Sequence, residues 1–153
     1  MSDADHLLRQ REREQNRDAA ANMAEAERRA AAYRAALRGD VAAETAAVLK
    51  LLKERGYPDM TGMTIERARF GLKYGGLGYK RERVAAWEIG DYTGTVHGDA
   101  YTGHIYLLSS GKFMLSGGHS SGGVRDLDDV FLEPRLPSVL SGLRSLRQRL
   151  GQQ

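Results

Sequence analysis

The chain has 153 residues, of which 41% are hydrophobic and 28% charged, as expected for one domain or for a small domain with an appendage. It contains no cysteine, which excludes disulfide bonds, thiolate zinc sites and a cysteine nucleophile. No apolar run approaches the roughly 20 residues that span a bilayer, and no apolar segment follows a basic start at the N-terminus. We therefore expect a cytoplasmic protein that makes no contact with membranes.

The formal net charge of +3 comes entirely from the C-terminal end of the chain. Arg144, Arg147 and Arg149 account for all of it, because the remaining 20 basic residues are matched by 20 acidic ones. The body of the protein is therefore neutral, which makes non-specific binding of nucleic acid over the whole surface less favourable.

The N-terminal third predicts two helices. Residues 5–38 contain no Gly or Pro and are rich in Ala and Arg, so they predict one long helix that Gly39 ends. Asp40 is a good N-cap for a second helix over 40–55. The short link between them favours an antiparallel helical hairpin, with a projecting arm as the alternative.

The long helix has two halves of different character. Residues 9–17 have no apolar side chain, so residues 1–17 are expected to fray. The second half has apolar residues at spacings of 4, 3, 4, 3 and 4, which is the pattern of a two-helix seam. We expect this seam to pack on the next helix or the body, or alternatively on a second copy of the chain. Its members, called here the Ala seam, are Ala19, Met23, Ala26, Ala30, Tyr33 and Leu37.

From Thr61 onward the apolar period changes from that of a helix to that of a strand. The alternation predicts an antiparallel sheet of four to five strands within residues 61–133. In the second of these strands, Ala85, Trp87 and Ile89 are expected to share one face. The strands are expected at 67–74, 82–90, 101–108 and 112–116, with a reversal at Gly75–Gly76.

Glycine-rich segments predict the connections between these strands. Ser109–Gly111 is expected to form a tight turn, because Gly111 stands where a three-residue hairpin loop needs a positive φ. Residues 94–98 are expected to form a loop, and residues 117–123 a flexible one. Residues 126–132 are expected to be a short strand or a turn.

The C-terminal residues predict an amphipathic helix over 138–150. Its apolar stripe, formed by Val139, Leu143, Leu146 and Leu150, is expected to cover one face of the sheet. The chain is thus predicted to be an α+β protein with an arm at 1–39 and a compact domain at 40–153.

Three histidines are weak candidates for a metal site or for a His-dependent hydrolase. His97, His104 and His119 offer neutral imidazole nitrogens, with Asp91 or Asp99 as acidic partners, but their spacing matches no metal motif. The glycine-rich loop 117–123 lacks the Gly-Lys-Ser/Thr of a phosphate-binding loop. We therefore expect no catalytic residue, no bound metal and no cofactor.

A second candidate surface is basic and aromatic. Six basic residues and one acidic residue lie between Arg67 and Arg83, and such a ribbon can neutralise phosphates and stack bases. The acidic residues of 84–135 are expected to balance it within the molecule, with nucleic acid or an acidic protein as alternatives. The candidate residues are Arg67, Arg69, Lys73, Tyr74, Tyr79, Lys80, Arg81 and Arg83.

These patterns favour a non-catalytic protein-interaction or assembly module, which self-associates through the N-terminal helix. The partner is then a second copy of the chain or another protein. The alternatives are a small nucleic-acid-binding or regulatory protein that uses the basic ribbon, and a His-dependent hydrolase or metal enzyme.

Overall fold

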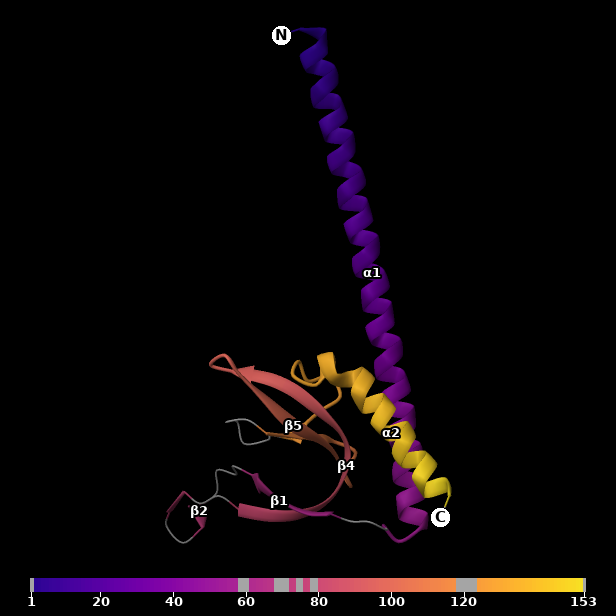
Figure 1. Ribbon diagram of the computed structural model, residues 1–153, viewed down its shortest axis with the longest axis vertical. Helices are drawn as coiled ribbons and strands as arrows, with labels where there is room; N and C mark the ends of the chain where they lie inside the picture. Colours follow the sequence, from indigo (N-terminus) through magenta and orange to yellow (C-terminus); the bar gives the residue numbers. More distant parts are fainter. Residues whose placement is uncertain are drawn as a thin grey trace. The chain divides into compact units, whose positions relative to one another are not determined.

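The computed structural model describes residues 2–57, 61–67, 72–73, 76–77, 80–117 and 124–152. It shows a long N-terminal helix, an antiparallel sheet and a C-terminal helix, which confirms the expected α+β class (Figure 1). The chain divides into two compact units, Met1–Ala36 and Leu37–Gln153.

The helix α1 extends without interruption from Asp3 to Glu54 and contributes to both units. The predicted helix end at Gly39 is therefore wrong, and with it the helical hairpin. A glycine inside a helix costs about 1 kcal/mol relative to Ala, which is too little to end a helix whose neighbours are strong helix formers. On both sides of Gly39 the buried stripe of Leu37, Val41 and Val48 supplies tertiary contacts that stabilise the helix.

The main sheet has five antiparallel strands in the order β1-β4-β5-β6-β7. Their bounds are Thr61–Arg67 for β1, Lys80–Val96 for β4, Asp99–Leu108 for β5, Phe113–Ser116 for β6 and Val124–Arg125 for β7. Two short strands, β2 at Leu72–Lys73 and β3 at Gly76–Leu77, form a separate antiparallel pair. Of the strand predicted at 67–74, Arg67 is the last residue of β1 and Leu72–Lys73 pair with β3 in the separate sheet. The other residues of that strand lie outside the described part of the chain.

The loop predicted at 94–98 is also wrong, because β4 continues to Val96 and only two residues make the reversal into β5. His97 and Gly98 have φ angles of 51° and 84°, the left-handed pair that a two-residue hairpin turn requires. Two further glycines of this hairpin, Gly94 and Gly103, make room for tyrosine rings on the opposite strand. Tyr101 faces Gly94 and Tyr92 faces Gly103 in the register, and a Cβ at either glycine would overlap the ring at 2.4–2.7 Å.

The turn predicted at Ser109–Gly111 is confirmed. Gly111 has a φ of 86°, and its N–H donates to the carbonyl of Leu108 at 2.9 Å. The N–H of Leu108 donates to the carbonyl of Lys112 at 2.9 Å, which closes the loop between β5 and β6.

A β-bulge interrupts β4 between Glu88 and Gly90. Glu88 pairs with Tyr106 and Gly90 with Ile105, so Ile89 is the extra residue on this strand. A bulge of this kind shifts the alternation of side chains by one position and increases the local twist. The bulge lies within the strand that Figure 1 draws as long and curved.

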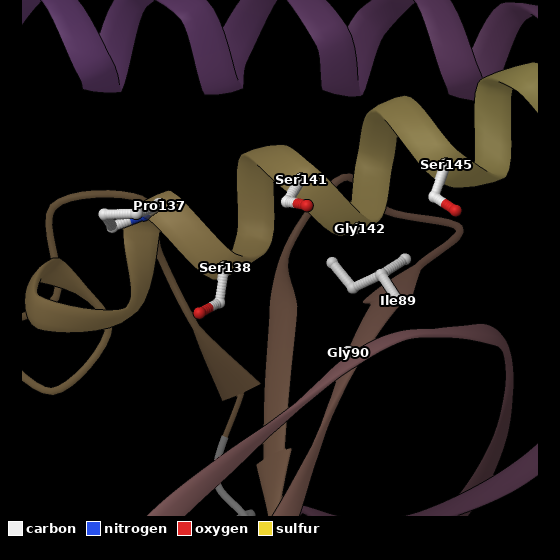
Figure 2. A pocket seen from close by; sticks show the side chains of 7 residues that line it. All are labelled: Ile89, Gly90, Pro137, Ser138, Ser141, Gly142 and Ser145. Carbon is white, nitrogen blue, oxygen red and sulfur yellow. The ribbon is translucent and has the colours of Figure 1, made fainter.

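The C-terminal helix α2 packs directly on this bulge. It covers Leu136–Gly151, slightly longer than the predicted 138–150, with Pro137 in its first turn. A Cβ on Gly142 would lie 1.7 Å from the carbonyl oxygen of Ile89, so only glycine allows this approach. Beside the contact lies an open depression of about 470 Å³, lined by Ile89, Gly90, Pro137, Ser138, Ser141, Gly142 and Ser145 (Figure 2).

A large hydrophobic core holds the second unit together. It joins the buried stripe of α1 from Leu37 to Leu52, the inner face of β4 and β5, and the apolar stripe of α2. Trp87 and Ile89 lie in this core with Ala85 packed against it, as predicted. The ring of Trp87 stacks on that of Tyr57, with 5.6 Å between the ring centroids. The predicted stripe of α2 is confirmed, since Val139, Leu143, Leu146 and Leu150 are all buried.

Residues 126–132 form turns and not a strand, and a short 3-10 helix, η1 at Glu133–Arg135, leads into α2. Two ion pairs connect this segment to α1, from Arg38 to Asp128 at 3.5 Å and from Arg38 to Glu133 at 3.7 Å. A third, from Arg147 to Glu44 at 3.0 Å, joins α2 to α1. These pairs are partly exposed, so each stabilises the fold by at most about 1 kcal/mol.

Candidate functional site

The first candidate site is the Ala seam on α1. Every residue from Ser2 to Ala36 is exposed, including the five seam residues that precede Leu37. Met23 is 65% exposed and Tyr33 is 63% exposed, although both are large and apolar enough to favour burial. The two lie on the seam with three alanines between and beside them, so the surface is narrow and allows a close approach.

The sixth seam residue is not available to a partner. Leu37 is only 9% exposed, because it belongs to the hydrophobic core of the second unit. The inclusion of Leu37 in the interaction seam is therefore corrected. The surface that remains open, called here the exposed seam, consists of Ala19, Met23, Ala26, Ala30 and Tyr33.

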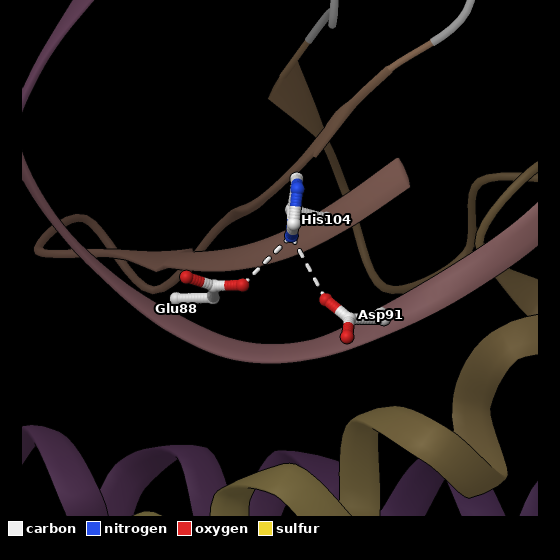
Figure 3. A group of neighbouring side chains, drawn as sticks. All are labelled: Glu88, Asp91 and His104. Atoms are coloured by element: carbon white, nitrogen blue, oxygen red, sulfur yellow. Dashed lines mark hydrogen bonds and ion pairs between the residues drawn. The ribbon is translucent and has the colours of Figure 1, made fainter. Parts of the chain in front are cut away.

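The second candidate site is a cluster of two carboxylates and one histidine on the main sheet (Figure 3). The Nδ1 atom of His104 lies 2.7 Å from Glu88 Oε1 and 2.8 Å from Asp91 Oδ1. Asp91 and His104 face each other in the register of β4 and β5. Glu88 and Asp91 are three residues apart, and in a regular strand they would face opposite sides. The bulge at Ile89 brings both carboxylates to the same side.

The electrostatics of this cluster favour a protonated histidine. Hydrogen bonds to Asp91 and to Glu88 raise the pKa of His104 above its ordinary value of 6.5, because both carboxylates stabilise the imidazolium. All three side chains are about half exposed, so solvent screens the charges. One nitrogen and two carboxylate oxygens are suitable ligands for a divalent cation, but all three side chains are exposed, which makes a weak site.

The three histidines named from the sequence do not gather in one place among the described residues. His104 joins the carboxylate cluster, whereas His97 lies in the turn between β4 and β5 and is not part of it. His119 falls outside the described residues. Asp91 was named from the sequence as an acidic partner, but Glu88 was missed. The isolated Gly90 inside a strand pattern is the signal that predicts a bulge and could have identified Glu88.

The two ends of the basic ribbon lie on the paired strands β1 and β4. Arg67 is paired with Lys80 in the register of β1 and β4, Glu66 with Arg81, and Thr64 with Arg83. The first and last residues of the ribbon therefore lie on neighbouring strands. Arg69, Tyr74 and Tyr79 lie outside the described residues, as does most of the loop 117–123. The binding of nucleic acid or of an acidic protein by this ribbon stays a prediction.

The chain matches no protein-family model, and no curated protein or solved structure shows significant similarity to it. In the described part of the chain, neither helix is apolar over a stretch long enough to cross a bilayer.

Proposed function

We propose that this chain is a non-catalytic assembly module that self-associates through the exposed seam of α1. The observation that carries the proposal is the exposure of Met23 and Tyr33, at 65% and 63%, on a helix that is exposed along its whole length from residue 2 to 36. Apolar residues at heptad spacing on such a helix are the signature of helix-to-helix pairing. The proposal includes a cytoplasmic location, in keeping with a chain that contains no cysteine.

The same residues set the expected strength of the association. Full burial of one large apolar side chain contributes about 1.5–3 kcal/mol to the free energy of association. Because Met23 and Tyr33 are 65% and 63% exposed, about two-thirds of that contribution is still available at each of them. Four such side chains in a dimer would contribute roughly 4–8 kcal/mol. Association costs about 4–15 kcal/mol in lost freedom of motion, so the dimer is weak and its population depends on protein concentration.

Sedimentation over a range from about 0.1 mM to several millimolar tests the proposal, because a surplus of at most about 4 kcal/mol corresponds to a dissociation constant near 1 mM. The wild-type chain should change from monomer to dimer within this range. The double variant Met23→Gln, Tyr33→Gln should shift the midpoint to higher concentration, because it removes the apolar contacts while Gln remains a good helix former.

The matched control is Leu7→Gln, Leu8→Gln. These two leucines are 59% exposed on the same helix and lie 11 and 12 residues before Ala19, outside the exposed seam. The control should associate like the wild type. A wild-type chain that is monomeric at every concentration would refute the proposal, as would an equal loss of association in the two double variants.

A further inference from the structure

The charges along α1 are separated into two blocks that overlap the exposed seam. Residues 18–27 contain three acidic side chains and no basic one, whereas residues 28–36 contain three basic side chains and no acidic one. Arg29 forms an ion pair with Glu25 at the boundary between the blocks, four residues apart on the same helix. The acidic block is Asp18, Glu25 and Glu27, and the basic block is Arg28, Arg29 and Arg34.

These blocks discriminate between the two orientations that a self-associated seam can adopt. In a parallel pair in register, each block lies beside its own copy, and Arg29 faces Arg34 across the flank of the seam. Like charges at such close distance repel each other and destabilise the pair. In an antiparallel pair that crosses near residue 28, the acidic block of each helix lies beside the basic block of the other. Because Glu27 and Arg29 lie on opposite flanks of the seam, the attraction acts between the blocks as a whole and not through one residue pair.

The apolar residues fit the antiparallel orientation in the same alignment. Met23 of each helix lies level with Tyr33 of the second copy, and Ala26 with Ala30. Small residues therefore meet at the centre, where they allow the helices to approach closely. A Met–Tyr pair closes each end, and a sulfur–aromatic contact contributes about 0.3–1.5 kcal/mol. Leu37 is buried in its own core and takes no part.

We infer that the partner of the exposed seam is a second copy of the chain in the antiparallel orientation. The inference rests on the proposed function, since it specifies how the seam pairs once it self-associates. It commits to the contacts Met23–Tyr33 and Ala26–Ala30 between copies, flanked by the acidic and basic blocks.

Disulfide trapping between single-cysteine variants tests the orientation. The natural chain has no cysteine, so Ala26→Cys and Ala30→Cys each introduce one reactive thiol. The two variants, one of them isotope-labelled, are mixed, oxidised gently and analysed by mass spectrometry. Because a disulfide needs Cα atoms about 4.4–6.8 Å apart, the antiparallel pair should give the Ala26→Cys/Ala30→Cys heterodimer in several-fold excess over both homodimers.

The control is Ala24→Cys, which lies on the same helix but off the seam and should give little disulfide. A predominance of homodimers would overturn the antiparallel orientation and leave self-association intact. A dimer in sedimentation that gives no disulfide at either position would overturn it as well. A wild-type chain that never dimerises would instead refute the proposed function itself.

The response to salt provides a second readout that needs no substitution. Attraction between opposite blocks is screened at high ionic strength, where the Debye length falls to about 3 Å. An antiparallel dimer should therefore weaken as salt is added, whereas a parallel dimer, relieved of repulsion, should strengthen. Strengthening by salt would contradict the antiparallel orientation even if both cysteine variants failed to fold.

Discussion

Replacing Gly142 by Ala should destabilise the second unit, although Ala is the better helix former. The new Cβ would lie 1.7 Å from the carbonyl oxygen of Ile89 and 2.6 Å from its carbonyl carbon. Both atoms belong to the backbone of β4 at the bulge, so no side-chain rotation can relieve the overlap. Helix α2 or the strand must move instead.

The magnitude follows from two opposing effects. Overpacking a close contact costs about 1–3 kcal/mol, and an overlap with rigid backbone belongs at the upper end of that range. The gain in helix propensity from Gly to Ala is about 1 kcal/mol. The free energy of unfolding should therefore fall by about 2 kcal/mol, which lowers Tm by roughly 4–8 °C in a domain of this size.

The assay is urea unfolding followed by the fluorescence of Trp87. Trp87 is the single tryptophan of the chain and is 2% exposed in the core of the second unit, so its emission reports unfolding directly. The matched control is Gly39→Ala in α1, where no atom lies within 4 Å of the new Cβ. That variant should be more stable than the wild type by about 0.5–1 kcal/mol. If Gly142→Ala were stabilised to the same extent, the close packing of α2 on the bulge would be refuted.

Two further predictions concern the main sheet. Gly103→Ala should lower the free energy of unfolding by about 1–3 kcal/mol, because its Cβ would lie 2.4 Å from the carbonyl oxygen of Ser116 and from the ring of Tyr92. The control is Thr102→Ala at the exposed neighbouring position, which should change the free energy of unfolding by less than about 0.5 kcal/mol. Equal effects of the two substitutions would contradict the Gly–Tyr pairing. In an NMR titration, His104 should have a pKa above 6.5 that falls on Asp91→Asn. Since the folded pKa is the higher one, the stabilisation by this cluster is fully present below the ordinary pKa and is lost as pH rises through the raised pKa. A pKa for His104 at or below 6.5 would exclude the double hydrogen bond.

The local patterns predicted several elements because each depends on neighbours in the sequence. The turn at Ser109–Gly111 needs a positive φ at one position, and glycine supplies it. The apolar stripe of α2 and the inner face of β4 follow the helical and strand periods closely enough that burial could be assigned to Val139, Leu143 and Trp87.

The glycines were misread wherever their role was set by a residue distant in sequence. Gly39 was expected to end a helix, but the buried stripe of α1 continues through it. Gly94 was expected to mark a loop, but it makes room for the ring of Tyr101 on the opposite strand. The sequence shows that a side chain is missing at each position. It does not show whether the space is needed for a turn, for a ring or for a helix, as at Gly142.

The sequence by itself determined the α+β class, the heptad spacing of the Ala seam and the charge blocks beside it, because these depend only on residue type and on the period of a helix. Tertiary structure decided which of those residues are free to bind. It buried Leu37 in the core and left Met23 and Tyr33 exposed. It also placed one extra residue, Ile89, in β4, which moved Asp91 to the same side as Glu88 and brought both carboxylates to His104. Side-chain direction along a strand has a period of two, so a single inserted residue changes the side chains that meet, and only the pairing with β5 shows where that residue lies.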